Sequence, residues 1–350
     1  MRKLVLMIAQ CLLLAGCTGL PTPREMGDMA LLRTIGVDGG GTGVALTVST
    51  GARAGESEGE KRSPLILEGW GDSLSAAAAA LRQKSDSWVF FGYTDQVLLG
   101  GDADLLPVLS WLAHDDELSL GAAVWLLRDG TAAHAIENGG EVGVERRLEA
   151  LAQDGKLGCG PMKRTAGEIY SALLDRGCTF LPVLEQGEEL TSVGYALVKG
   201  GGTVAVLEGE EARGLELLCE QPMEEVMEVH LPGGPVSIRL MGGQLDCKPR
   251  FEGGELKKLE LRSRVSARLC QWEQDPDPRQ RQAVSAQVEE RLHARLSAAL
   301  NRLQRERAEC VGIGSRVAIA APWHWAGLEE RWQEVFGAVD LELEVRVTLD

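Results

Sequence analysis

The sequence predicts an α+β fold, with mixed and antiparallel sheets and packed helices arranged in two to three domains. Strands and helices alternate irregularly in the first half of the chain, and alternating strands dominate the second half. One long amphipathic helix is expected over residues 278–310, because apolar side chains recur there every three or four positions. The 350 residues are enough for more than one hydrophobic core.

In the first half, short β-branched runs bounded by Gly, Asp and Ser predict strands. Asp72 or Ser73 is placed to cap an alanine-rich helix. The clearest helix runs from Thr165 to Gly177, because Thr165 and Glu168 match a capping box and Gly177 is a typical stop. The expected strands are 29–37, 43–50, 64–70, 88–92, 95–99 and 119–127, and the expected helices are 73–84, 102–113 and 165–177.

The second half begins with two alternating strands around a Gly turn, over residues 191–209. The long helix starts at Pro278, a typical residue for a first turn. Near the end of the chain, Trp325, Trp332 and Phe336 lie at helical spacing and predict a core-facing helix. A stacking platform for a sugar or a base is the alternative use of this Trp-rich segment. The other expected elements are helices 210–219 and 325–336 and strands 224–231, 234–241, 244–251, 256–269 and 339–349.

The chain begins with the pattern of a secretory signal peptide. Arg2 and Lys3 precede an apolar run, residues 4–16, that carries no charge and is too short to span a bilayer comfortably. The run leads into "LLAGC", which resembles the lipobox of bacterial lipoproteins. Cys17 is therefore the predicted site of lipidation, and an ordinary secreted protein cut near Ala15 is the alternative.

Four segments follow from these patterns. Residues 1–16 are the predicted signal peptide, and residues 17–23 are a lipid-anchored spacer. Residues 24–185 form an N-terminal α/β domain. Residues 186–350 form a strand-rich C-terminal domain that contains the long helix and is open to a further division near residue 250.

The charge of the protein excludes some partners. The formal net charge is −16, and it becomes −18 once the signal peptide, with two basic residues and no acid, is removed. A protein this acidic is repelled by nucleic acid and by anionic lipid. No second apolar stretch is long enough to cross a bilayer. We therefore expect no nucleic-acid partner, and we expect the lipid at Cys17 to hold the protein on a membrane.

No pattern supports a catalytic, cofactor or metal site. The chain has no GxSxG motif, and its five histidines lie in unlike contexts. The segment "HDDEL", residues 114–118, has side chains that bind metals, but a solvated exit from the preceding apolar helix explains it. We expect no enzyme, no cofactor and no metal.

Six cysteines remain besides Cys11 of the signal peptide and the anchor Cys17. They are dispersed and form no CxxC, which supports a metal site only weakly. The sequence leaves open whether they pair in disulfides. They are Cys159, Cys178, Cys219, Cys247, Cys270 and Cys310.

The glycine-rich stretch "TIGVDGGGTGVALTVS", residues 34–49, has two interpretations. It is similar to the phosphate hairpin of the actin and sugar-kinase superfamily, and it also fits a plain β-hairpin. Export to a compartment poor in ATP and the lack of a second phosphate loop favour the plain hairpin. We therefore expect Gly39–Gly41 to form an exposed turn without a bound phosphate. A nucleotide-sized cleft lined by these glycines would count against this interpretation.

Several stretches keep their order along the chain and match motifs of one family. "REMGDMA" and "IGVD" follow the lipobox, "FFGY" precedes "TDQVLLG", and a strand hairpin leads into "GEEARGLELL". "ECVGIG" and a Trp with "EVF" precede the last strand. Together these motifs resemble the Ger(x)C lipoproteins, the C subunits of spore germinant receptors. The residues that carry the resemblance are Arg24, Glu25, Asp28, Met29, Ala30, Ile35, Gly36, Val37, Asp38, Phe90, Phe91, Gly92, Glu211, Arg213, Gly214, Trp332, Glu334, Val335 and Phe336.

The resemblance implies a non-enzymatic lipoprotein on the outer face of the inner spore membrane. Such a protein would act with two membrane-embedded subunits, called A and B, in sensing nutrient germinants. The sequence departs from the family pattern at Tyr93, where the family has His, at Glu309, where it has Asp, and at Ile313, where it has Phe.

Two other classes of protein remain as alternatives. A solute-binding lipoprotein of a transporter usually has two similar α/β lobes around a cleft, and the strand-rich second half of this chain lacks that regular alternation. A cell-envelope enzyme is disfavoured because no catalytic constellation is present.

Overall fold

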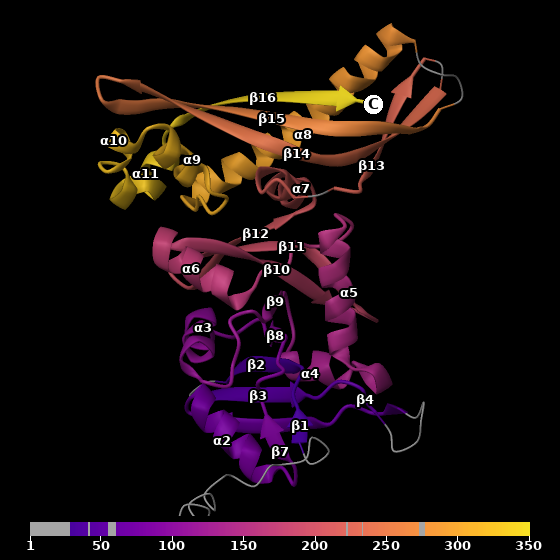
Figure 1. Cartoon of the computed structure of the whole chain (residues 1–350), viewed down its shortest axis with the longest axis vertical. Helices are drawn as coiled ribbons and strands as arrows, with labels where there is room; N and C mark the ends of the chain where they lie inside the picture. The colour runs from indigo at the N-terminus through magenta and orange to yellow at the C-terminus, as the bar shows by residue number, and fades with distance from the viewer. Residues whose placement is uncertain (1–28, 41–42, 55–60, 222, 233, 273–276) are drawn as a thin grey trace, which may run out of the picture.

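The computed structural model describes residues 29–40, 43–54, 61–221, 223–232, 234–272 and 277–350. The signal peptide, Cys17 and the spacer lie outside these residues. The α+β prediction is confirmed. A large mixed sheet occupies the N-terminal half, and a second sheet, antiparallel except for its last pair of strands, occupies the C-terminal half (Figure 1). No helix among the described residues is both long and apolar enough to cross a membrane.

The N-terminal sheet has eight strands in the order β12-β11-β10-β9-β8-β2-β3-β6. Its centre is parallel, from β10 through β9 and β8 to β2, and both flanks are antiparallel. Because β11 and β12 belong to this sheet, it continues beyond residue 186. The strands are β2 (Thr34–Gly40), β3 (Gly43–Ser49), β6 (Ile66–Gly71), β8 (Gln96–Leu99), β9 (Ala123–Leu127), β10 (Cys178–Gln186), β11 (Leu190–Lys199) and β12 (Gly202–Glu208).

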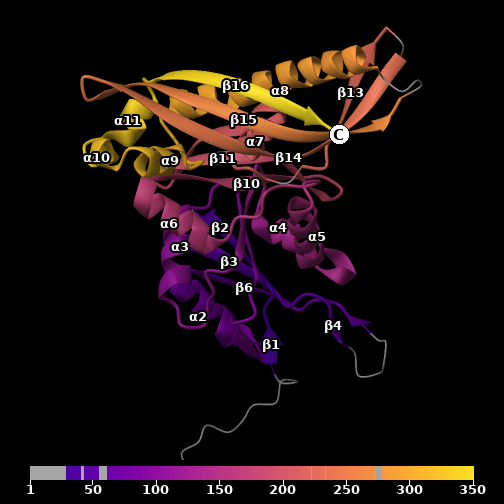
Figure 2. The same ribbon diagram turned by 45° about the horizontal axis from the view of Figure 1, so that its top comes forward.

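Helices cover both faces of the large sheet (Figure 2). One hydrophobic core lies between the sheet and α2, α3 and α6, and another lies on the opposite face beneath α4 and α5. Ser73, and not Asp72, caps α2, and the predicted capping box of Thr165 and Glu168 is present. The helices are α2 (Leu74–Lys84), α3 (Leu105–His114), α4 (Ala132–Glu137), α5 (Val144–Lys156) and α6 (Ala166–Arg176).

Two small two-stranded sheets lie beside the large one. In the first, β1 (Met29–Leu31) pairs in parallel with β7 (Trp88–Phe90). In the second, β4 (Arg53–Ala54) pairs with β5 (Lys61–Arg62). The first sheet lies at the end of the molecule farthest from the C-terminal sheet, as both views show (Figures 1 and 2).

The C-terminal sheet has four strands in the order β13-β14-β15-β16, and its last pair is parallel. The long helix, α8, packs against this sheet, and a shorter one, α7, packs against α8 and against strands β11 and β12 of the large sheet. A single hydrophobic core thereby includes residues of both sheets. These elements are α7 (Gly209–Leu218), β13 (Val226–Leu231), β14 (Gly234–Glu252), β15 (Glu255–Gln271), α8 (Pro278–Glu306) and β16 (Asp340–Leu349).

The structure corrects several predicted elements. The expected strand 29–37 is two strands, β1 and β2, which pair with different partners. The expected strands 234–241 and 244–251 are one strand, β14, with a register shift between Leu240 and Gly242. The sequence did not predict α4, α5 or α9 (Ile313–Ala320).

The C-terminal helices also differ from expectation. The long helix ends at Glu306, four residues before the predicted end at 310, because Arg307 adopts a left-handed conformation. The expected helix 325–336 is broken into α10 (Pro322–Trp325), a 3-10 turn η3 (Glu329–Arg331) and α11 (Trp332–Phe336).

Candidate interaction site at the junction of the sheets

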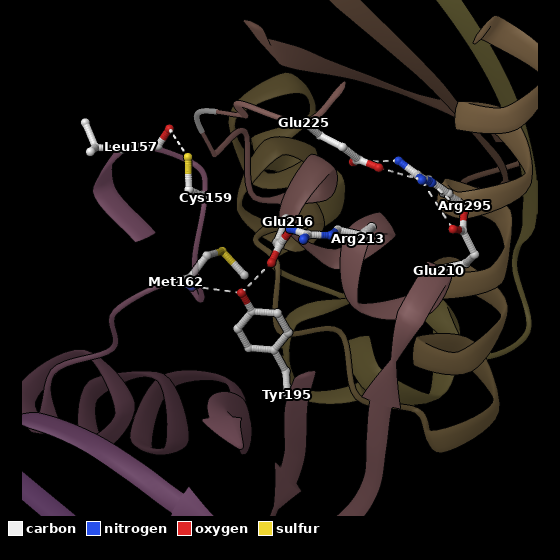
Figure 3. Close-up of polar contacts among 9 residues, drawn as sticks. All are labelled: Leu157, Cys159, Met162, Tyr195, Glu210, Arg213, Glu216, Glu225 and Arg295. Atoms are coloured by element: carbon white, nitrogen blue, oxygen red, sulfur yellow. Dashed lines mark hydrogen bonds and ion pairs between the residues drawn. The ribbon is translucent and has the colours of Figure 1, made fainter. Parts of the chain in front are cut away.

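A polar cluster lies where the large sheet meets the C-terminal half of the protein (Figure 3). Strand β11 supplies Tyr195, helix α7 supplies Arg213 and Glu216, and helix α8 supplies Arg295. The strand–turn–helix arrangement follows from the sequence, since the glycines between β11 and β12 take positive φ angles that other residues rarely adopt. The cluster therefore joins segments that are far apart along the chain.

Tyr195 and Glu216 form the buried half of the cluster. Tyr195 is 1% exposed, and its hydroxyl donates to Glu216 Oε1 at 2.7 Å while it accepts from the backbone N–H of Met162 at 2.8 Å. Burial, reinforced by the Glu216 carboxylate, raises the pKa of Tyr195 well above its ordinary value. The phenol therefore stays protonated at physiological pH and acts as a hydrogen-bond donor.

Arg213 balances the charge of this carboxylate. Its Nη1 atom donates to Glu216 Oε2 at 2.8 Å. Burial opposes the charged form of Arg213, but the adjacent Glu216 carboxylate outweighs it and raises the pKa of the guanidinium. The guanidinium of Arg213 therefore stays charged beside this carboxylate, which strengthens the hydrogen bond between them.

Arg295 forms the second half of the cluster. It is 7% exposed and contacts two carboxylates, with 2.8 Å from Nη1 to Glu225 Oε2 and 3.2 Å from Nη2 to Glu210 Oε1. We refer to Arg295 with Glu210 and Glu225 as the clamp. Next to it, α7 and α8 approach so closely that a Cβ atom on Gly214 would lie 2.2 Å from the carbonyl oxygen of Arg295. Glycine is thus required at position 214, and the clamp holds the two helices at this distance.

A hollow of about 360 Å³ opens beside the cluster, and Arg213, Glu216, Tyr195 and Cys159 are among the residues that line it. On its wall, the charges of Arg213 and Glu216 are paired with each other. No acid–base pair poised for proton transfer results, because Tyr195 is held protonated and Glu216 is neutralised by Arg213. The arrangement is suited to holding two parts of the protein in a defined orientation.

The sequence-predicted residues of this segment have different roles. Arg213 and Gly214, which carry the family resemblance with Glu211, belong to the cluster, and the glutamate of this segment that contacts Arg295 is Glu210. Arg295 itself was missed. Its signal was present in the sequence, because an arginine between Leu292 and Leu296 interrupts the apolar stripe of the long helix.

The "IGVD" motif packs a helix against the large sheet. The Asp38 carboxylate accepts hydrogen bonds from the backbone N–H groups of Ala132, at 2.6 Å, and Ala133, at 3.0 Å, at the start of α4. A Cβ atom on Gly36 would lie 2.7 Å from Ile136 of the same helix. Burial raises the pKa of Asp38, although these two hydrogen bonds oppose the shift. Both motif residues thus have a structural role.

The glycine-rich stretch forms the expected β2–β3 hairpin, but the prediction of an exposed turn is wrong for Gly39. Gly39 is a half-buried residue of β2, paired with Val44, and its N–H donates to Asp102 Oδ1 at 3.2 Å. Gly40 pairs with Gly43, and Gly41 lies outside the described residues. The backbone continues as a strand because both sides of the hairpin keep pairing up to the tip.

Contrary to expectation, Gly39 also lines an open cleft of about 830 Å³, which is large enough for a nucleotide. The lining carboxylates argue against a phosphate there, and no Lys or Arg occurs among the described residues of its wall. The lining carboxylates are those of Asp72, Asp102, Asp104 and Asp115.

The "ECVGIG" motif forms a buried hydrogen-bond network around Glu309, which is 0% exposed. Its carboxylate accepts from four consecutive backbone N–H groups, those of residues 311–314, and from the indole N–H of Trp332 at 2.9 Å. Gln333 then donates to carbonyl oxygens of both Glu309 and Arg176, at 3.1 Å each. This hydrogen-bond network links the C-terminal helices to the large sheet.

Other predicted residues are placed as follows. Trp332 and Phe336 are buried, as the core prediction expected, whereas Trp323 is 93% exposed. His114 ends α3 and contacts the carbonyl of Ser110, which fits a helix exit. The described residues contain no cluster of metal-binding side chains.

The six cysteines from Cys159 to Cys310 are all free thiols. Burial raises the pKa of Cys178 to about 12, that of Cys219 to about 12 and that of Cys247 to about 11. These thiols therefore stay protonated and unreactive at physiological pH.

Fold and site together define a protein whose polar motifs hold two sheets in a fixed arrangement. Comparison with known proteins gives the family. Residues 23–186 match the family "Spore germination protein N-terminal domain", and residues 193–350 match "Spore germination B3/ GerAC like, C-terminal". The chain belongs to this family and is a germinant receptor subunit of the C type.

A solved structure agrees with this assignment. The crystal structure of the GerBC protein superposes with a TM-score of 0.59 at 14% sequence identity, over 90% of this chain and 96% of that one. At this identity the likeness concerns the fold. No curated protein matches the sequence significantly. The family is one of receptor subunits and is not a known class of enzyme.

Proposed function

We propose that this protein is the lipid-anchored subunit of a nutrient germinant receptor and that it works by contacts with the membrane-embedded A and B subunits. The observation that carries the proposal is the match of both halves of the chain to the germination family. The lipobox at Cys17 supports attachment to the extracytoplasmic face of the inner spore membrane.

The junction fits a role in assembly. A subunit that transmits a signal by contact must keep its surfaces in a defined relation, and the Tyr195–Glu216–Arg213 and Arg295 contacts join the two sheets. A transporter's solute-binding lipoprotein, the alternative from the sequence, is less well supported. Its two lobes are usually alike, whereas the two sheets here differ in strand number and topology.

The anchor is tested by substitution of Cys17 in the sporulating host. Cys17→Ala is expected to abolish labelling by a radioactive fatty acid and to release the protein from the membrane fraction. The matched control is Cys11→Ala, which removes a thiol from the signal peptide and leaves the lipobox intact. Lipid labelling that persists in Cys17→Ala would refute the lipidation site.

The receptor function is tested in spores that carry Cys17→Ala or lack the gene, in a strain without other germinant receptors. Such spores are expected to lose germination in response to the nutrients that the complete receptor senses, while germination by a non-nutrient trigger is retained. Co-purification of the lipidated protein with both membrane-embedded subunits tests the partners. Normal nutrient germination in the deletion strain would contradict the proposal.

A further inference from the structure

The parallel pair β1–β7 presents an aromatic and apolar surface to solvent. Its register places Met29 opposite Trp88 and Leu31 opposite Phe90. Side chains of paired residues lie on the same face of a sheet, and alternate residues along each strand share that face. These four side chains therefore form one face, and Tyr93 joins them because its ring lies 6.0 Å from that of Phe90. We refer to these five residues as the tip patch.

The burial of the intervening residues shows which way this face points. Ala30 is 3% exposed and Val89 is 1% exposed, so these two side chains point into the protein. The tip patch must then point outward. Trp88 is 41% exposed and Tyr93 is 54% exposed. Large aromatic side chains gathered on an outward face are typical of a surface that binds something apolar.

The position of the tip patch indicates what it meets. Met29 follows the predicted lipid anchor Cys17 by twelve residues, and an extended chain of that length reaches about 40 Å at most. Strands β1 and β7 lie at the indigo end of the molecule, opposite the C-terminal sheet (Figures 1 and 2). In a lipidated protein, this end is the one that is held near the bilayer.

Charge does not bring the protein to that surface. The net charge of the processed protein, −18, is unfavourable next to anionic lipid. Trp and Tyr, in contrast, are the side chains preferred at the boundary between lipid headgroups and acyl chains, because they combine an apolar ring with a polar N–H or O–H group.

We propose that the tip patch inserts into the interfacial region of the bilayer to which Cys17 is anchored, with Trp88 and Tyr93 as the inserting side chains. The proposal rests on the lipid anchoring proposed above. A lipid anchor at one residue leaves a protein free to rotate about its tether, whereas a second contact at the tip fixes its long axis relative to the membrane. The germination subunit would then present its C-terminal sheet away from the lipid.

The test uses the processed, full-length lipoprotein reconstituted into phosphatidylcholine vesicles whose acyl chains carry bromine, a quencher of tryptophan fluorescence located within the bilayer. Brominated vesicles are expected to quench part of the emission relative to unbrominated ones. Trp88→Phe removes that quenched part. Tyr93→Asp, which keeps every tryptophan, lowers it by about twofold or more because a carboxylate resists insertion. Trp323→Phe, at an exposed tryptophan of α10 remote from β1, is the matched control and leaves quenching unchanged.

The outcomes separate this proposal from the proposed anchoring. Lipidation is measured first by mass spectrometry of the N-terminal peptide, so that a protein without lipid refutes the anchor and not the patch. A lipidated, vesicle-bound protein whose tryptophans are equally bright in both kinds of vesicle refutes insertion. Shielding of Trp88 from a water-soluble quencher only when the membrane-embedded receptor subunits are present would mean that a protein covers the patch, and would also overturn the proposal.

Discussion

The buried carboxylate of Glu309 offers a direct test of the hydrogen-bond network that holds the C-terminal helices together. In Glu309→Gln the side chain keeps its shape, but one oxygen becomes an NH₂ group. The least harmful orientation places that group at the Oε2 position, where the backbone N–H of Gly314 and the indole N–H of Trp332 now donate, each at 2.9 Å. Two buried donors then lose their acceptor, at about 1–3 kcal/mol each, so the expected loss of unfolding free energy is about 4 kcal/mol.

The assay is equilibrium unfolding in urea, followed by tryptophan emission. The matched control is Glu334→Gln, the same chemical change at an exposed position of α11, which is expected to shift stability by less than about 0.5 kcal/mol. A Glu309→Gln protein within about 1 kcal/mol of the wild type would refute the role of this carboxylate as the shared acceptor.

Two further predictions concern buried charges. Burial raises the pKa of Glu145 above its ordinary value of 4.5, so the folded protein binds the proton more tightly than the unfolded chain and loses stability as pH rises from that value through the raised pKa. The stability of Glu145→Gln relative to the wild type should therefore be greater when urea midpoints are measured at about pH 7 than at about pH 4. An identical change of the urea midpoint with pH in the two proteins would contradict this. Arg295→Met removes the guanidinium from between Glu210 and Glu225 and is expected to cost about 3 kcal/mol. The exposed control Arg346→Met should cost less than about 0.5 kcal/mol in the same urea titration, and equal effects of the two would remove the case for the clamp.

Local signals accounted for most of the secondary structure. The helix from Thr165 was predictable because its capping box and its stop at Gly177 depend only on neighbouring residues, and both are present. Helix α5 was missed although the signal existed, since Val144, Leu148 and Leu151 recur at helical spacing and are buried.

Other elements could not be predicted from neighbouring residues alone. Gly242 and Gly243 suggested a turn between two strands, but they lie at a bulge in the continuous strand β14, and Gly242 has a φ of 116°. Glycine permits either conformation, so only the pairing with β15 selects one. The same holds for the split of the expected strand 29–37, which depends on partners more than 50 residues away at β7 and β8.

The candidate site was only partly predictable for a related reason. Arg213 and Gly214 were singled out in the sequence, but their partners were not: Arg213 pairs with Glu216 one turn on in the same helix, and Gly214 packs against Arg295 on a distant helix. A hydrogen bond or a close approach between helices is set by three-dimensional packing, and the choice between Glu210 and Glu211 depends on which face of α7 meets α8.

By itself, the sequence determined the α+β class, the family and most helix and strand positions, because these depend on periodicity, short-range caps and motif order. Only the tertiary structure decided that the motif residues Asp38, Arg213 and Glu309 hold elements together, and that Gly39 pairs within a strand beside an acidic cleft. The outward tip patch of β1 and β7 also emerged only there. Each of these depends on contacts between residues far apart in the chain, and folding selects such contacts through the burial of the whole core.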